Sequence, residues 1–150
     1  MEEILKPIVG AGSNVRCCWW YIRKGGRRPA VEYFDKFMTE DEQTRVSRTI
    51  EALGKGQSVP ESCFKARNGK PKLFEFKSGK HRLLAFHLSI SPKVAGYVII
   101  HGCPKAGGTS SDIRSSDEDA AKSKMQECVT RLQQKGILPK SGVKKRGAKK

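Results

Sequence analysis

The order of the sequence patterns predicts an α+β protein in which two helices interrupt a mostly antiparallel sheet and a third helix follows it. Three observations support this class: a pair of amphipathic stretches over residues 29–54, a series of strand-like runs over residues 73–101, and an amphipathic stretch after residue 116. The chain has 150 residues, enough for one domain with a core. No apolar run approaches the roughly 20 residues that span a bilayer, so we expect no membrane partner.

The first half of the chain predicts one strand and two helices. Val15–Ile22 is β-branched and aromatic and is closed by a glycine pair, which predicts a buried strand. Pro29–Phe37 has a proline where a helix tolerates one and apolar residues at helical spacing, so it predicts a short helix. Thr39 and Glu42 form a capping-box pattern that starts a second helix, and Gly54 ends it. The two helices should form a hairpin.

The second half predicts an antiparallel meander followed by a helix. Short apolar runs separated by turn residues predict strands at Leu73–Phe76, Arg82–Leu88 and Val94–His101, and a shorter strand is expected near Cys63–Ala66. Ser116 and Asp119 match a second capping box, and the helix that they start should end at Gly136.

These elements define three parts of the chain. We expect residues 1–14 to be a flexible leader, residues 15–136 to form the domain, and residues 137–150 to be a disordered basic tail. The leader lacks the basic start and apolar stretch of a secretory signal. Five cysteines with no C-x-x-C pair argue against a disulfide framework or a zinc ribbon. We therefore expect a cytoplasmic protein with no metal and no cofactor.

Positive charge is the strongest indication of a partner. The chain carries 30 basic and 15 acidic residues, a net charge of +15. Six basic residues lie in Lys140–Lys150, and Lys65–Arg82 holds seven basic residues against one acid. Clustered cations bind polyphosphates by releasing counterions, although such a run is also typical of a solvated strand face. We expect these residues to bind RNA: Lys65, Arg67, Lys70, Lys72, Lys77 and Lys80.

Adjacent His81 and Arg82 are candidates for chemistry on RNA. Cleavage through the 2′-hydroxyl needs proton transfer and stabilisation of the extra phosphate charge. Histidine titrates near neutral pH, and arginine binds phosphate oxygens with a fixed charge. Because strand side chains alternate, the two should point to opposite faces unless the preceding turn twists the strand. Each of the three histidines, which include His87 and His101, also suits a structural place in a strand.

Two longer segments carry a family resemblance. KLFEFKSGKHRLLAF at Lys72–Phe86 and YVIIHGCPK at Tyr97–Lys105, between a helical hairpin and a final helix, resemble the RelE superfamily of toxins. The similarity is to its HigB and phage-derived RelE-like branch, and it covers about Val15 to Leu132. It implies a RelE-like fold: an N-terminal strand and helical hairpin, then an antiparallel meander and a C-terminal helix.

The resemblance also implies a function. Such proteins are toxins of type II toxin–antitoxin systems, mRNA interferases that cut messenger RNA in the ribosomal A site and so inhibit translation. A cognate antitoxin, expected here to be a helix-turn-helix protein, holds them inactive. By this resemblance Arg82 contacts the scissile phosphate, Lys105 is a second phosphate contact, and Glu75 has a catalytic or structural role.

The sequence departs from the family pattern at residues that matter for catalysis. His81 stands where the family has a tyrosine, and no tyrosine follows Tyr97 to act at the nucleophile. The general base therefore stays open. A non-catalytic RNA- or ribosome-binding module on the same scaffold is the alternative, and a DNA-binding protein is a weaker one because no predicted helix has a strongly basic face.

Overall fold

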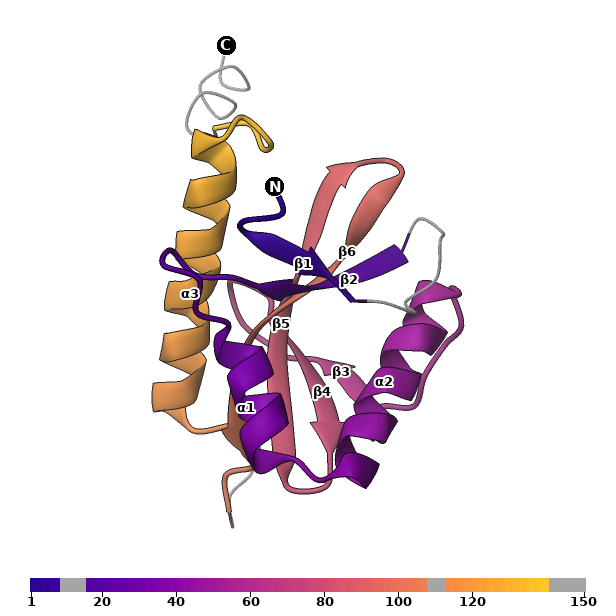
Figure 1. The fold of residues 1–150 in the computed structure, drawn as a ribbon. Coiled ribbons are helices and arrows are strands. Elements are labelled where there is room, and N and C mark those ends of the chain that lie inside the picture. The colour runs from indigo at the N-terminus through magenta and orange to yellow at the C-terminus, as the bar shows by residue number, and fades with distance from the viewer. Residues whose placement is uncertain (9–15, 108–112, 141–150) are drawn as a thin grey trace.

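Six strands form one mixed sheet in the order β1-β2-β6-β5-β4-β3 (Figure 1). The computed structural model describes residues 1–8, 16–107 and 113–140. Neighbouring strands are antiparallel except for β2 and β6, which run parallel. The strands are β1 (Leu5–Pro7), β2 (Arg16–Tyr21), β3 (Phe64–Ala66), β4 (Phe74–Ser78), β5 (His81–Ser91) and β6 (Val94–Pro104), and the helices are α1 (Pro29–Phe37), α2 (Glu40–Gly54) and α3 (Ser115–Gln134).

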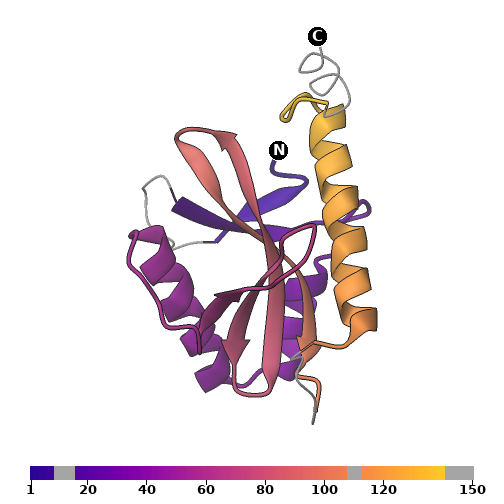
Figure 2. The ribbon, with the colours of Figure 1, turned by 180° about the vertical axis from the view of Figure 1, so that it is seen from behind.

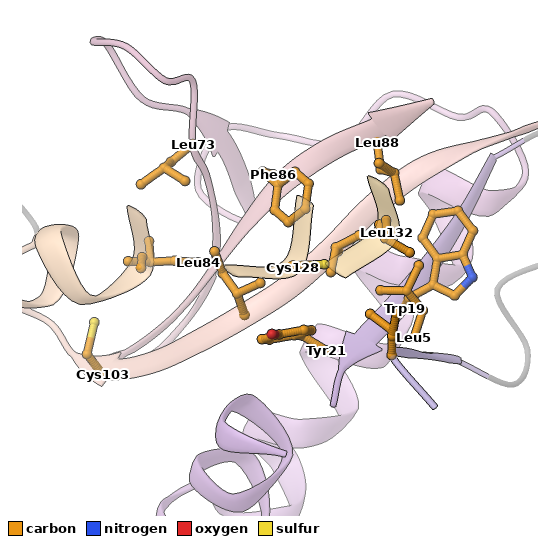
Figure 3. Close-up of a cluster of buried hydrophobic side chains, with 14 of the residues drawn as sticks. Leu5, Trp19, Tyr21, Leu73, Leu84, Phe86, Leu88, Cys103, Cys128 and Leu132 are labelled. Carbon is orange, nitrogen blue, oxygen red and sulfur yellow. The ribbon is translucent and has the colours of Figure 1, made fainter. Parts of the chain in front are cut away.

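Helices cover both faces of the sheet. Figure 1 shows α1 and α2 on one face, and Figure 2 shows α3 along the other. The core is correspondingly split: Val46, Ile50 and Phe76 belong to the cluster under α1 and α2, whereas Leu84 and Leu132 belong to the cluster under α3. Figure 3 shows the α3-side cluster, to which β1 and β2 also contribute. The α+β class is confirmed.

The helical hairpin has the predicted limits because its signals are local. Pro29 is the first residue of α1. The Thr39 hydroxyl accepts from the Glu42 backbone N–H at 3.2 Å, and the Glu42 carboxylate accepts from the Thr39 N–H at 2.8 Å. Both halves of the capping box are therefore present at the start of α2, which ends at Gly54.

The predicted meander is confirmed, with longer strands. β4, β5 and β6 pair in sequence order, and β3 adds the short edge strand expected near residue 64. Gly79 lies in the turn that connects β4 to β5. Its φ is +58°, a left-handed conformation that glycine adopts without strain.

The two ends of the domain differ from the expectation. Within the supposed leader, Leu5 pairs with Tyr21 in the sheet, and both side chains are buried. The apolar residues of β1 complete the α3-side core, which is why this segment is not a free leader. Within the supposed tail, Ile137 and Leu138 pack against the same core. Residues 9–15 and 141–150 lie outside the described residues.

The predicted capping box of α3 was wrong. The helix begins at Ser115 with Arg114 at its N-cap position, and no side chain caps it. Ser116 lies inside the first turn, and of the acids that follow it, Asp117 pairs with His101 of β6 and Glu118 pairs with Arg67. In the described ranges no helix combines the length and the apolar character needed to cross a bilayer.

Candidate functional site

Arg82 and Glu75 lie on the α3 face of the sheet and are buried. Arg82 is 5% exposed and Glu75 4% exposed, and Arg82 Nε lies 3.6 Å from Glu75 Oε1. Arg67 donates to Glu75 Oε2 at 2.8 Å and pairs with Glu118 of α3 at 3.3 Å. These ion pairs join β4, β5 and the first turn of α3. Arg67 and Arg82, expected on an RNA-facing surface, therefore point into the protein.

Arg82 also stabilises the β4–β5 turn, which precedes it, through hydrogen bonds to the backbone. Its Nη1 donates to the carbonyl oxygens of Gly79 at 3.0 Å and His81 at 2.9 Å. These bonds fix the backbone on both sides of Lys80 because they engage the residues that flank it. In this arrangement Arg82 positions its neighbours.

His81 lies on the opposite face, against the helical hairpin. Its Nε2 is 3.3 Å from Glu42 Oε1, and its Nδ1 is 2.7 Å from the Tyr33 hydroxyl. The Thr39 N–H, helped by nearby His81, holds the pKa of Glu42 below its usual value, so this carboxylate is ionised. It favours the tautomer with hydrogen on Nε2, which leaves Nδ1 to accept from Tyr33.

Tyr33 completes a chain of three polar groups from three elements. Burial, reinforced by surrounding negative charge, raises its pKa to about 12, so the hydroxyl stays protonated near neutral pH. Its ring packs on Gly102 of β6, where an added Cβ would lie 2.5 Å from the ring. Sequence reasoning found His81 but missed Tyr33 and Glu42, because only the docking of the hairpin brings them to it.

Two exposed lysines lie beside His81 at the same end of the sheet. The Lys105 N–H donates to the Lys80 carbonyl at 2.6 Å, so the residue after β6 is held against the turn before β5. Both side chains are exposed. The His81 chain and these lysines therefore share the end of the sheet at which the β4–β5 turn lies (Figure 1).

The remaining predicted basic residues do not form a single cluster. Lys65, Lys70 and Lys72 are exposed on β3 and the loop that follows it, and Lys77 is half-buried. The cationic run is thus divided: five of its lysines lie at or near the surface in separate places, Arg67 is half-buried and Arg82 is buried.

His101 lies on the α3 face of the sheet, although simple alternation of side chains along β6 would place it on the opposite face. Ala85 pairs with Ile99 and Leu84 with His101, so Ile100 is an extra residue in β6. Such a bulge re-aims the side chains after it. His101 consequently joins Ile100 on the α3 face, where its Nε2 lies 2.9 Å from Asp117 and its Nδ1 lies 2.7 Å from Lys124 Nζ.

Cys103 lies near this pair and completes a set of metal-ligand types. Ligand atoms of His101, Cys103 and Asp117 lie within 4.8 Å of one another. Burial raises the pKa of the Cys103 thiol to about 12, and the Lys124 ammonium already occupies His101 Nδ1. A cation bound here would lie beside the Lys124 ammonium, and the repulsion between the two positive charges makes the environment a poor fit for a metal.

No protein-family model, curated protein or solved structure matches the chain. Geometry alone therefore defines the class: an α+β protein whose sheet carries, at one end, a Glu–His–Tyr hydrogen-bond chain beside exposed lysines.

Proposed function

We propose that this protein is a RelE-like endoribonuclease, the toxin of a type II toxin–antitoxin pair, which cuts messenger RNA in the ribosomal A site and so inhibits translation. The observation that carries the proposal is the Glu42–His81–Tyr33 chain beside Lys80 and Lys105. The sequence resemblance and the net charge of +15 support RNA as the substrate.

The chain of groups supplies a route for the proton. In this proposal the Tyr33 hydroxyl takes the proton of the attacking 2′-hydroxyl and passes its own to His81 Nδ1. Glu42 stabilises the imidazolium that forms, as an orienting carboxylate does in other acid–base sites. The 2′-oxygen bonds to phosphorus as the bond to the 5′-oxygen breaks, and the leaving 5′-oxygen takes a proton from water, so the products are a 2′,3′-cyclic phosphate and a 5′-hydroxyl end.

The cations have distinct roles. Lys80 and Lys105 stabilise the charge on the phosphorane, since their ammonium groups are exposed at the rim. Arg82, expected from the resemblance to contact the phosphate, is proposed instead as a positioning residue that holds the Lys80–His81 backbone. Glu75 orients Arg82 from the same face.

A ribosome-programmed cleavage assay tests the proposal. Wild-type protein should cut the messenger and leave cyclic phosphate ends, and its expression should slow growth. His81→Gln and Tyr33→Phe should reduce cleavage about 10²- to 10⁴-fold while ribosome binding stays within about twofold. Lys93→Ala, an exposed lysine in the β5–β6 turn, is the charge-matched control for Lys80→Ala and Lys105→Ala.

The same assay can reject the proposal. If wild-type protein neither slows growth nor yields cut messenger, it is not an endoribonuclease. Loss of toxicity in Arg82→Ala supports the positioning role only if circular dichroism shows that the variant is folded, because Arg82 is buried.

The second candidate function is a non-catalytic RNA- or ribosome-binding module. The ion pairs that Arg67 and the buried Arg82 make with acids favour it, because these acids already occupy the guanidinium groups. Co-sedimentation with ribosomes without cut messenger would establish this function.

The cognate antitoxin is the proposed protein partner. A small helix-turn-helix protein encoded beside this chain should restore growth when the two are expressed together. A neighbouring protein that leaves toxicity unchanged would not be that antitoxin.

A further inference from the structure

Phe37, the last residue of α1, is an exposed aromatic side chain. It is 55% exposed, and Met1 is the other large hydrophobic residue exposed in the described part of the chain. Single exposed apolar residues are common and need no function. What distinguishes Phe37 is the arrangement of the groups around it.

Phe37 belongs to a supported row of rings. Its centroid lies 4.9 Å from that of Tyr33, with 35° between the ring planes, and the Tyr33 ring lies 5.5 Å from that of His81. Tyr33 is held by its bond to His81 and by close packing on Gly102. The Tyr33 ring is thus preorganised, and it supports one side of Phe37, which lowers the side-chain entropy that the protein would lose when a ligand stacks there.

Cations accompany this row. Lys36 Nζ lies 5.4 Å from the centroid of the Phe37 ring. Lys80 and Lys105 are exposed next to His81, and Figures 1 and 2 show the end of α1 and the β4–β5 turn at the same end of the molecule. Acidic side chains also lie near Phe37 along the chain: Asp35, Glu40 and Asp41. Glu40 and Asp41 occupy the first turn of α2, where the helix dipole stabilises them.

We infer that Phe37 is a stacking site for an unpaired nucleobase of single-stranded RNA, with Lys36 and Lys80 on the flanking phosphates. Exposed aromatics beside cations are the usual means of binding single strands, and such stacking tolerates any base. The inference rests on the proposed function only in taking RNA as the ligand, and it requires no cleavage. It assigns the base-binding part of the site to α1, a helix for which the sequence showed no nucleic-acid signal.

Binding of a single-stranded RNA of about ten nucleotides to the full chain, followed by fluorescence anisotropy, tests the inference. Phe37→Ala and Phe37→Leu should weaken binding roughly 5- to 100-fold, whereas Phe37→Trp should retain it. Phe37→Leu is the matched control for hydrophobicity, since it keeps an apolar side chain and removes the ring.

An abasic RNA separates stacking from other effects of the substitution. Its affinity for wild-type protein should fall by about the same factor as that of intact RNA for Phe37→Ala, and Phe37→Ala should then bind both RNAs alike. If Phe37→Ala instead lost the same affinity for abasic RNA as for intact RNA, stacking would be overturned, and Phe37 would be a contact with another part of the RNA, such as its backbone.

The remaining outcomes distinguish the inference from the proposed function. If wild-type protein binds RNA and both Phe37→Ala and Phe37→Leu bind it equally well, stacking is overturned and the RNA function stands. If wild-type protein binds neither RNA nor ribosomes, both fall together.

Discussion

His81 and Arg82 are neighbours in β5, yet their side chains lie on opposite faces of the sheet. His81 contacts Tyr33 of α1 and Glu42 of α2, whereas Arg82 faces Glu75 on the α3 side. Alternation along the strand predicted this separation, and it is confirmed. The two side chains therefore cannot contact one phosphate from the same face of the sheet, which is why we assign them different roles.

The buried Glu75 carboxylate should be a major source of stability. Glu75→Gln removes the charge that faces Arg67 and Arg82, and breaking a buried pair costs about 3–5 kcal/mol. Urea unfolding followed by tryptophan fluorescence measures the loss. Glu51→Gln is the control, since Glu51 pairs with Lys55 on the exposed face of α2 and should cost less than about 1 kcal/mol. Similar losses in both variants would contradict this prediction.

Gly102 should be required for the docking of α1. Gly102→Ala would place a Cβ 2.5 Å from the Tyr33 ring, and such overpacking costs about 1–3 kcal/mol. The cost should shrink when Tyr33→Ala is added, which a double-mutant cycle by urea unfolding detects. Gly107→Ala is the matched control, because a Cβ there meets nothing within 4 Å. An unchanged cost in the double mutant would show that the ring is not the cause.

Stability should fall as the solution is acidified through the pKa of an ordinary histidine. Burial, together with the Lys124 ammonium, lowers the pKa of His101 below its usual 6.5, although Asp117 opposes this. In the unfolded chain His101 takes up a proton near pH 6.5, whereas in the folded protein it does so only at lower pH. The free energy of unfolding therefore decreases as the pH falls below about 6.5. Urea unfolding between about pH 8 and pH 5 should show a flatter profile for His101→Gln, and identical profiles would exclude His101 as the cause.

Cysteine reactivity should follow burial. Burial raises the pKa of Cys103 and of Cys128 to about 12, whereas Cys63 is partly exposed. Only the thiolate reacts with alkylating agents, so native protein should be alkylated at Cys63 well before the other two. Peptide mass spectrometry after timed labelling gives each rate separately, and unfolding in urea should make the three similar. Fast labelling of native Cys103 would contradict the packing of the α3 face.

Much of the fold could be predicted because its signals are local. The limits of α1 and α2 follow from Pro29 and from the Thr39–Glu42 capping box, both of which act within one turn of helix. The order of the meander follows from its turns. Two predictions failed because they depend on contacts between distant segments: β1 lies in the supposed leader and pairs with β2, and Ser116 and Asp119 do not cap α3. The limits of α3 itself lie within two residues of those predicted.

The candidate site could be predicted only in part. Each of His81, Lys80 and Lys105 was a candidate from the sequence or from the family resemblance, and the structure places all three at one end of the sheet. The buried state of Arg82 depends on Glu75 and on the helix that covers this face. His101 reaches Asp117 because of a bulge, and a bulge is a property of strand pairing that no single segment encodes.

By itself the sequence determined the class of fold, the two helices of the hairpin, the excess of positive charge and the opposite faces of His81 and Arg82. Each of these depends on composition or on periodicity within a few residues. The tertiary structure alone decided the partners of the charged groups. Tyr33 lies 48 residues from His81 in the chain and Glu118 lies 51 from Arg67, so only the packing of the helices on the sheet brings these groups within hydrogen-bond distance.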